Sequence, residues 1–78
     1  MTVRLVECGR GDQVRIVRID AGRGATLRLM NLGLSVGGTA EVVQCSPMRG
    51  PLLLSHAGTE VALGYHLAEK ILVEKGKD

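Results

Sequence analysis

The hydrophobic pattern of this chain consists of short apolar segments separated by turns that contain glycine, and several of the segments have the composition of β-strands. The clearest strand covers residues 13–19 and is dense in β-branched residues. Its apolar positions do not simply alternate, since two fall on each face of an extended chain: Val14 with Ile16, and Val17 with Ile19. We therefore expect a β-bulge or a strong twist near Ile16 that turns all four side chains toward the core.

A β-hairpin is expected at Ala57 and Gly58, which have the length and composition of a two-residue turn. In this register the apolar residues on one face pair across the two strands as Leu54 with Val61 and Leu52 with Leu63. The opposite face should be the wetter one, and it holds Leu53, Ser55, Glu60 and Ala62.

Shorter elements are expected before and after these strands. They are an apolar strand or loop at residues 3–6, a strand from Ala40 to Cys45, one helical turn within 64–69, a last strand from Ile71 to Val73, and a polar tail at 75–78.

One segment, Ala25 to Leu34, has the pattern of a helix, which Gly33 should end. At 100° per residue its apolar side chains fall on two sides, one with Leu27, Met30 and Leu34 and the other with Leu29 and Leu32. A short helix on a small domain buries only one side well. The other side must be covered by something else or remain in water.

The length of 78 residues and the hydrophobic content of 45% allow one domain, residues 1–78, with a single core. Eleven glycines and two prolines favour an all-β fold with many tight turns over a helical bundle. No apolar run is long enough for a membrane span, and no signal peptide is recognisable, so we expect a cytoplasmic protein without direct membrane insertion. Cys8 and Cys45 are then expected as reduced thiols rather than as a disulfide.

The charge and the aromatic content argue against a nucleic-acid partner. The net charge is only +2, and Tyr65 is the only aromatic residue, so the stacking platforms of RNA-binding and single-strand-binding proteins are missing. Six arginines stand against three acidic residues between positions 1 and 39. A basic patch formed by such an excess of arginines usually keeps the surface solvated, although it would also suit an acidic partner surface or an anionic membrane leaflet.

We find no catalytic constellation, and therefore expect no enzyme activity. No serine lies in a nucleophile elbow, and no phosphate-binding loop of the G-x-x-x-x-G-K-[ST] type is present. The potential metal ligands are scattered without ligand spacing: Cys8, Cys45, His56 and His66. We expect Cys45 to be a small core or rim residue and His56 a solvated turn residue, with no bound cofactor. A transition metal held weakly, or shared between two copies of the chain, stays open as an alternative.

The ordered elements, with a Leu-x-x-Leu-Gly-Leu run at the end of the helix, together resemble the FeoA family. The matching residues are Leu29, Leu32, Gly33 and Leu34 in this run, then Gly37, Pro47, Gly50, Pro51, Gly58, Val61, Ala62, Leu63, Ala68, Ile71 and Val73. The resemblance covers essentially the whole chain. It implies a small SH3-like β-barrel of five or six strands with one short helix.

The resemblance also implies a role in ferrous iron uptake. Members of the family are cytosolic accessory proteins that act with FeoB, a membrane permease carrying a GTP-binding domain. Two alternatives are an RNA-binding module of SH3-like fold and a metal-sensing module, since a related barrel is the C-terminal domain of metal-dependent repressors. The low charge and the single aromatic residue count against RNA binding.

The helix departs from the family pattern at Leu27 and Met30, which make its outer side more apolar than the fold requires. The expected core holds the residues that match the family's core positions: Leu29, Leu32, Leu54, Val61, Leu63, Ile71 and Val73. Leu27 and Met30 are then left outside as a surface for the permease or for another copy of the chain, because exposed apolar patches mark interfaces. The loop expected to form the rim of this surface consists of Pro47, Met48, Arg49, Gly50 and Pro51.

Overall fold

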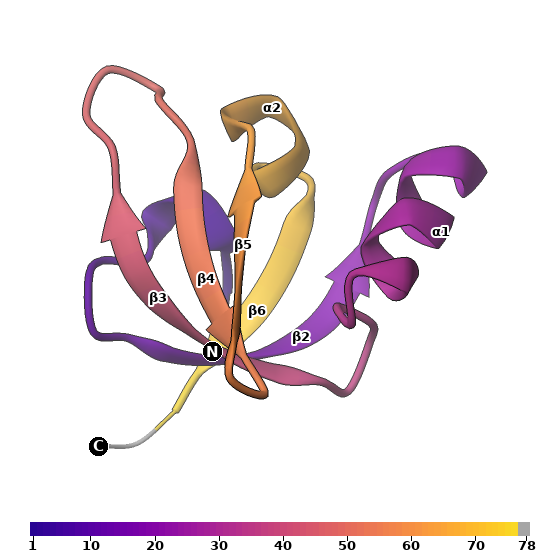
Figure 1. Ribbon diagram of the computed structural model, residues 1–78, viewed down its shortest axis with the longest axis horizontal. Helices are drawn as coiled ribbons and strands as arrows, with labels where there is room; N and C mark the ends of the chain where they lie inside the picture. Colours follow the sequence, from indigo (N-terminus) through magenta and orange to yellow (C-terminus); the bar gives the residue numbers. More distant parts are fainter. Residues whose placement is uncertain (77–78) are drawn as a thin grey trace.

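In the computed structural model, which describes residues 1–76, six antiparallel strands form one sheet that curls into an SH3-like barrel (Figure 1). The order of the strands in the sheet is β1-β6-β2-β3-β4-β5. The strands are β1 (Thr2–Arg4), β2 (Gln13–Ile19), β3 (Thr39–Cys45), β4 (Leu52–His56), β5 (Thr59–Leu63) and β6 (Ile71–Lys75). The helical elements are the 3₁₀ turn η1 (Leu5–Glu7), the helix α1 (Arg23–Asn31) and the single turn α2 (Tyr65–Ala68). The predicted fold class is confirmed.

Strand β2 has the predicted bounds and the predicted bulge. Its pairing with β6 shifts register between Ile16 and Arg18. Val14 and Ile16 are buried, whereas Val17 and Ile19 are only half-buried. The bulge therefore shifts the pairing as expected, but it does not bring all four apolar side chains fully inward. Beyond the bulge the strand still pairs with β6 and leads toward α1 (Figure 1).

The hairpin of β4 and β5 has the predicted register. Leu54 pairs with Val61 and Leu52 with Leu63, and all four side chains are buried. Ala57 and Gly58 have positive φ angles of 50° and 82°, which match the right-handed twist of the two strands. A turn of this type fixes the pairing, and the pairing in turn decides which side chains enter the core.

The barrel interior is aliphatic and also contains the thiol of Cys8. The buried side chains are Leu5, Cys8, Val14, Ile16, Leu29, Leu34, Ala40, Val42, Leu52, Leu54, Val61, Leu63, Ala68, Ile71 and Val73. Of the expected core residues only Leu32 is wrong, because it is exposed on the surface.

The last strand is longer than predicted. Strand β6 lies between β1 and β2 in the sheet, and its pairing with β2 extends to Lys75, which lies opposite Val14. The Gly76 amide then donates to the carbonyl of Gln13 at 2.6 Å. Lys75 therefore belongs to the sheet rather than to the predicted tail at 75–78, and residues 77 and 78 lie outside the described residues. Between residues 1 and 76, no helix has the length and apolar character needed to cross a membrane.

Candidate partner-docking site

Helix α1 ends in a capping turn that decides which of its leucines enter the core. Gly33 adopts a φ of +90°, the Leu34 amide donates to the carbonyl of Leu29 at 2.8 Å, and the Gly33 amide donates to that of Met30 at 2.9 Å. These are the two hydrogen bonds of a Schellman motif, in which the residue after the glycine packs against the last turn of the helix. Leu34 is thereby folded back beside Leu29, and both are buried.

The same turn leaves Leu32 outside. The helix covers Arg23–Asn31 instead of the predicted Ala25 to Leu34, so Leu32 is the C-cap residue and no longer follows the helical periodicity. The sequence interpretation placed Leu32 inside and Leu34 with the outer side chains, and both placements are wrong. The signal that predicts the observed arrangement is Gly33 itself, since a glycine after a helix indicates a reversal that returns the next apolar residue to the core.

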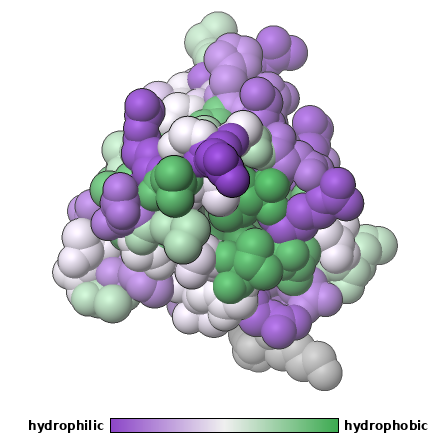
Figure 2. All heavy atoms as spheres, turned by 90° about the vertical axis from the view of Figure 1, so that its right-hand side faces the viewer, coloured by the Kyte–Doolittle hydropathy of each residue, from purple (hydrophilic) through white to green (hydrophobic). Residues whose placement is uncertain are grey.

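Three large apolar side chains are exposed here, Leu27 and Met30 on α1 and Leu32 at its C-cap, and we call the three together the α1 face. Their exposed fractions are 52%, 53% and 42%. Leu27 and Met30 are thus outward, as predicted. Figure 2 views the molecule from the side that carries α1 and shows hydrophobic surface between hydrophilic side chains.

A groove continues from Leu32 toward the hairpin. It has a volume of about 560 Å³, and its walls come from the end of α1, the turn after β4 and strand β5: Asn31, Leu32, Gly33, His56, Ala57, Thr59, Glu60, Val61 and Ala62. Within residues 1–76, strand β5 lies at one end of the strand order and pairs with β4 alone. The groove therefore joins an apolar helix end to a sheet edge.

His56 is half-buried beside this groove and is not the solvated turn residue expected from the sequence. Its Nδ1 lies 2.7 Å from the carbonyl oxygen of Thr39, which only accepts hydrogen bonds, so Nδ1 carries the proton. Its ring also packs against Gly33, where a Cβ atom would approach the ring carbon Cδ2 to 2.9 Å. His56 thus holds the turn after α1 against the barrel.

The loop at 47–51 does not form a rim of this site. It joins β3 to β4 at the opposite side of the barrel from α1 (Figure 1). Met48 projects from its tip with 97% of its surface exposed, and the guanidinium of Arg49 lies 5.8 Å from the centre of the Tyr65 ring. The fold therefore separates the two surfaces that the sequence analysis expected to be adjacent.

The candidate metal ligands are also separated. Cys45 pairs with Leu52 at one end of β3 and β4, whereas His56 lies at the other end of β4. Cys8 is buried, and burial raises the pKa of its thiol, while the Cys45 thiol is exposed. Residues 1–76 contain no group of three or more His, Cys, Asp or Glu side chains arranged to hold a metal ion.

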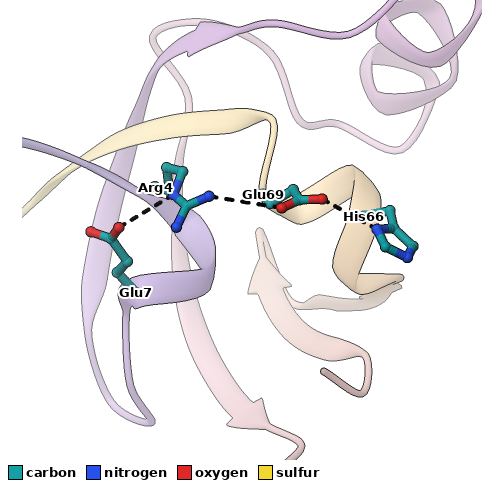
Figure 3. A network of polar contacts seen from close by, with 4 residues as sticks. All are labelled: Arg4, Glu7, His66 and Glu69. Atoms are coloured by element: carbon teal, nitrogen blue, oxygen red, sulfur yellow. Dashed lines mark hydrogen bonds and ion pairs between the residues drawn. The ribbon is translucent and has the colours of Figure 1, made fainter. Parts of the chain in front are cut away.

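His66 belongs to a polar network on the surface (Figure 3). Its Nδ1 lies 3.2 Å from Glu69, whose other carboxylate oxygen lies 3.7 Å from the guanidinium of Arg4. Arg4 also pairs with Glu7 at 3.3 Å. The network connects η1 with the end of α2 and thereby helps to position α2.

The arginines differ in how they are neutralised. Arg15 pairs with Glu74 and Arg18 with Asp20. In the part of the chain that the structure describes, Arg23 and Arg28 of α1 form no ion pair. The helix with the α1 face therefore also carries two cations that are available to an acidic group.

Comparison with known proteins gives a consistent family. The sequence profile of the FeoA domain matches residues 3–75. A Methanocaldococcus jannaschii protein that carries the name Fe(2+) transport protein A is 39% identical over 64 residues, which are 82% of this chain and 76% of that protein. An Fe(2+) transport protein A/Fe(2+) transporter FeoB fusion protein of Porphyromonas gingivalis is 41% identical over 72 residues, 92% of this chain and 8% of the fusion.

Solved structures agree on the fold. The crystal structure of an iron uptake regulatory protein, FeoA, superposes with a TM-score of 0.89 at 38% identity and covers 97% of this chain and 100% of that one. A manganese-dependent transcriptional repressor contains a similar barrel, with a TM-score of 0.88 over 96% of this chain and 41% of the repressor. At 24% identity the repressor shows a shared fold alone.

Proposed function

The chain belongs to the FeoA domain family, and from this premise we propose that it is a non-enzymatic accessory module of ferrous iron uptake that docks on a FeoB-type permease. The docking would take place on the cytoplasmic side of the membrane, and the α1 face would make the contact. The fusion protein of Porphyromonas gingivalis supports this proposal, because its name joins transport protein A and the transporter FeoB in one chain.

The observation that carries the proposal is the exposure of Leu27, Met30 and Leu32. The buried core consists of other residues and does not need these three side chains. Burying such side chains against a partner contributes roughly 25 cal/mol per Å² of apolar surface, and Met adapts its shape to the surface that it meets. Arg23 and Arg28, which form no ion pair within residues 1–76, add a preference for acidic groups. The partner surface should therefore be apolar with an acidic border.

The proposal includes no resident metal and no nucleotide hydrolysis by the isolated domain. Of the four candidate ligands, Cys45 and His56 lie at opposite ends of a strand pair, Cys8 is buried, and His66 pairs with Glu69 on the surface. Elemental analysis of the purified monomer should find less than one iron or zinc per chain. One tightly held ion per monomer, lost in a Cys45→Ser variant, would overturn this part of the proposal.

The docking proposal is tested by measuring the affinity of the chain for the FeoB-type permease of the same organism in lipid nanodiscs. Leu27→Asp and Met30→Asp should each raise Kd about 30-fold, the effect of losing one central interface residue. Both variants should stay folded, since exposed substitutions change stability by about 0.5 kcal/mol. Gln44→Asp adds the same charge at an exposed position of β3 and should bind as the wild type does. Unchanged binding by both α1 variants would refute the proposed contact.

A further inference from the structure

The tip of the loop between β3 and β4 is a tight turn built from residues that do not favour it. The Gly50 amide donates to the carbonyl of Pro47 at 3.1 Å, and the two residues between them, Met48 and Arg49, have φ angles of 57° and 61°. A turn with two left-handed residues usually contains Asn and Gly, because side chains with a Cβ are strained there. This chain instead has a long apolar side chain, Met48, at the first strained position and a long cationic one, Arg49, at the second.

The loop holds this tip in one conformation. Pro47 and Pro51 restrict the backbone on either side, and the Ser46 amide donates to the carbonyl of Pro51 at 3.2 Å. A Cβ atom on Gly50 would approach the Cβ of Ser46 to 2.7 Å, so the two sides of the loop are in close contact. The backbone at Met48 is therefore held at the tip, and its side chain projects into solvent instead of folding back onto the barrel.

The neighbours of Met48 have the composition of an interface. The guanidinium of Arg49 lies over Tyr65 and forms no ion pair within residues 1–76. Tyr65 begins α2, which the contact between Arg4 and Glu69 fixes at its other end (Figure 3). Met, Arg and Tyr are enriched in the energetically important parts of protein interfaces.

We propose that Met48, Arg49 and Tyr65 form a second docking site, which we call the tip site, and that Met48 inserts into an apolar pocket with an acidic rim on a partner protein. The proposal rests on the proposed function, because the partner would be the same permease. The acidic rim follows from the unpaired charge of Arg49. Since the loop that carries Met48 and Arg49 lies on the opposite side of the barrel from α1, the domain would bridge two parts of its partner (Figure 1).

A protein pocket accounts for these observations better than a lipid surface does. The tip offers one large apolar side chain and one cation, and even a single acyl chain binds membranes only marginally. The backbone conformation of the turn, in contrast, suits a shaped pocket, because a loop that is already ordered loses little backbone freedom on binding.

The test replaces the strained pair by the residues that the turn favours, in the double variant Met48→Asn/Arg49→Gly. Relief of strain should raise the Tm of the isolated domain by about 4–8 °C. The same variant should bind the permease in nanodiscs at least 10-fold more weakly than the wild type. Met48→Leu keeps an apolar anchor and should bind within three-fold of the wild type, whereas Met48→Ser should lose as much affinity as the double variant.

The other outcomes separate the two proposals. If the wild type binds the permease and the double variant binds equally well, the tip site is refuted and the α1 face stands. If the wild type does not bind the permease at all, both proposals fail. Binding of the wild type to phosphatidylglycerol vesicles, lost in the double variant, would identify the tip as a lipid contact and would also refute the protein pocket.

Discussion

The hairpin of β4 and β5 and the helix α1 both carry large apolar side chains, but the barrel covers them very differently. In the hairpin, the four inward residues Leu52, Leu54, Val61 and Leu63 are all buried. In α1, Leu29 is buried while Leu27 and Met30 remain about half exposed. One region is apolar because the core requires it, and the other has more apolar surface than the core uses.

The difference follows from how each element is attached to the barrel. Strand β4 of the hairpin pairs with both β5 and β3, which fixes its register. With the register fixed, each side chain points either into the barrel or out of it. Helix α1 lies beside the sheet and enters the core only through Leu29 and through Leu34 beyond the capping turn. Substitutions on the outside of α1 therefore leave the core intact, which makes that surface available for a partner.

The largest expected effect is a loss of stability from a cavity in the hairpin. Leu54→Ala should lower the free energy of unfolding by about 2–5 kcal/mol, because the packed barrel cannot close around the missing side chain. Leu27→Ala, the matched change on α1, should cost less than about 1 kcal/mol. Urea denaturation of both variants measures this contrast. Equal losses would show that the helix contributes to the core as much as the hairpin does.

A smaller effect is expected at the turn that attaches α1. Gly33→Ala should destabilise the domain by about 1–3 kcal/mol, because it forces a Cβ atom into a left-handed conformation and against the ring of His56. Gly24→Ala, inside the same helix and free of close neighbours, should stabilise it by about 0.5 kcal/mol. Thermal unfolding of the two variants should therefore shift in opposite directions. A neutral Gly33→Ala would contradict the capping turn.

The smallest expected effect is a loss of local stability at low pH, which should affect the sheet at β2 and β6 and not α1. Hydrogen bonding and charge from Arg15 lower the pKa of Glu74, and the Gly9 amide, 2.8 Å away, lowers that of Asp12. Both groups favour the folded state when ionised, so their contribution is complete above the ordinary carboxyl pKa values and is lost as the pH falls through the lowered ones. Below about pH 4, the protection factors of the amides in β2 and β6, which are exchange rates corrected for the intrinsic effect of pH, should fall. Glu74→Gln should weaken this pH dependence, and an unchanged profile would contradict the assignment.

The same contrast explains what the sequence predicts and what it does not. The turn at Ala57 and Gly58 and the alternation beside it predict the hairpin register, because strand pairing is local and has a period of two. Helical periodicity separated Leu27 and Met30 from Leu29, and the resemblance to the FeoA family indicated which of the two sides faces outward. The predicted positions of Leu32 and Leu34, one in the core and the other on the outer side, are the reverse of those observed. The helical period of 3.6 residues does not hold past Asn31, because the capping turn at Gly33 changes the direction of the chain.

The groove and the tip were beyond local patterns. The contact between Gly33 and His56 joins residues 23 positions apart, and it forms only when the barrel closes. The left-handed φ angles of Met48 and Arg49 have no signal in residues that normally avoid that conformation. The loop at 47–51 was correctly identified as a loop, but its position opposite α1 depends on the order of the whole sheet.

The most direct test of the central claim, that the α1 face docks on the permease, is a methyl NMR titration of the labelled domain with the FeoB-type permease in nanodiscs. The account predicts that the methyl signals of Leu27, Met30 and Leu32 shift or broaden first, while those of Leu54 and Val61 in the core change least. Perturbation that spares all three α1 residues while the complex forms would contradict it.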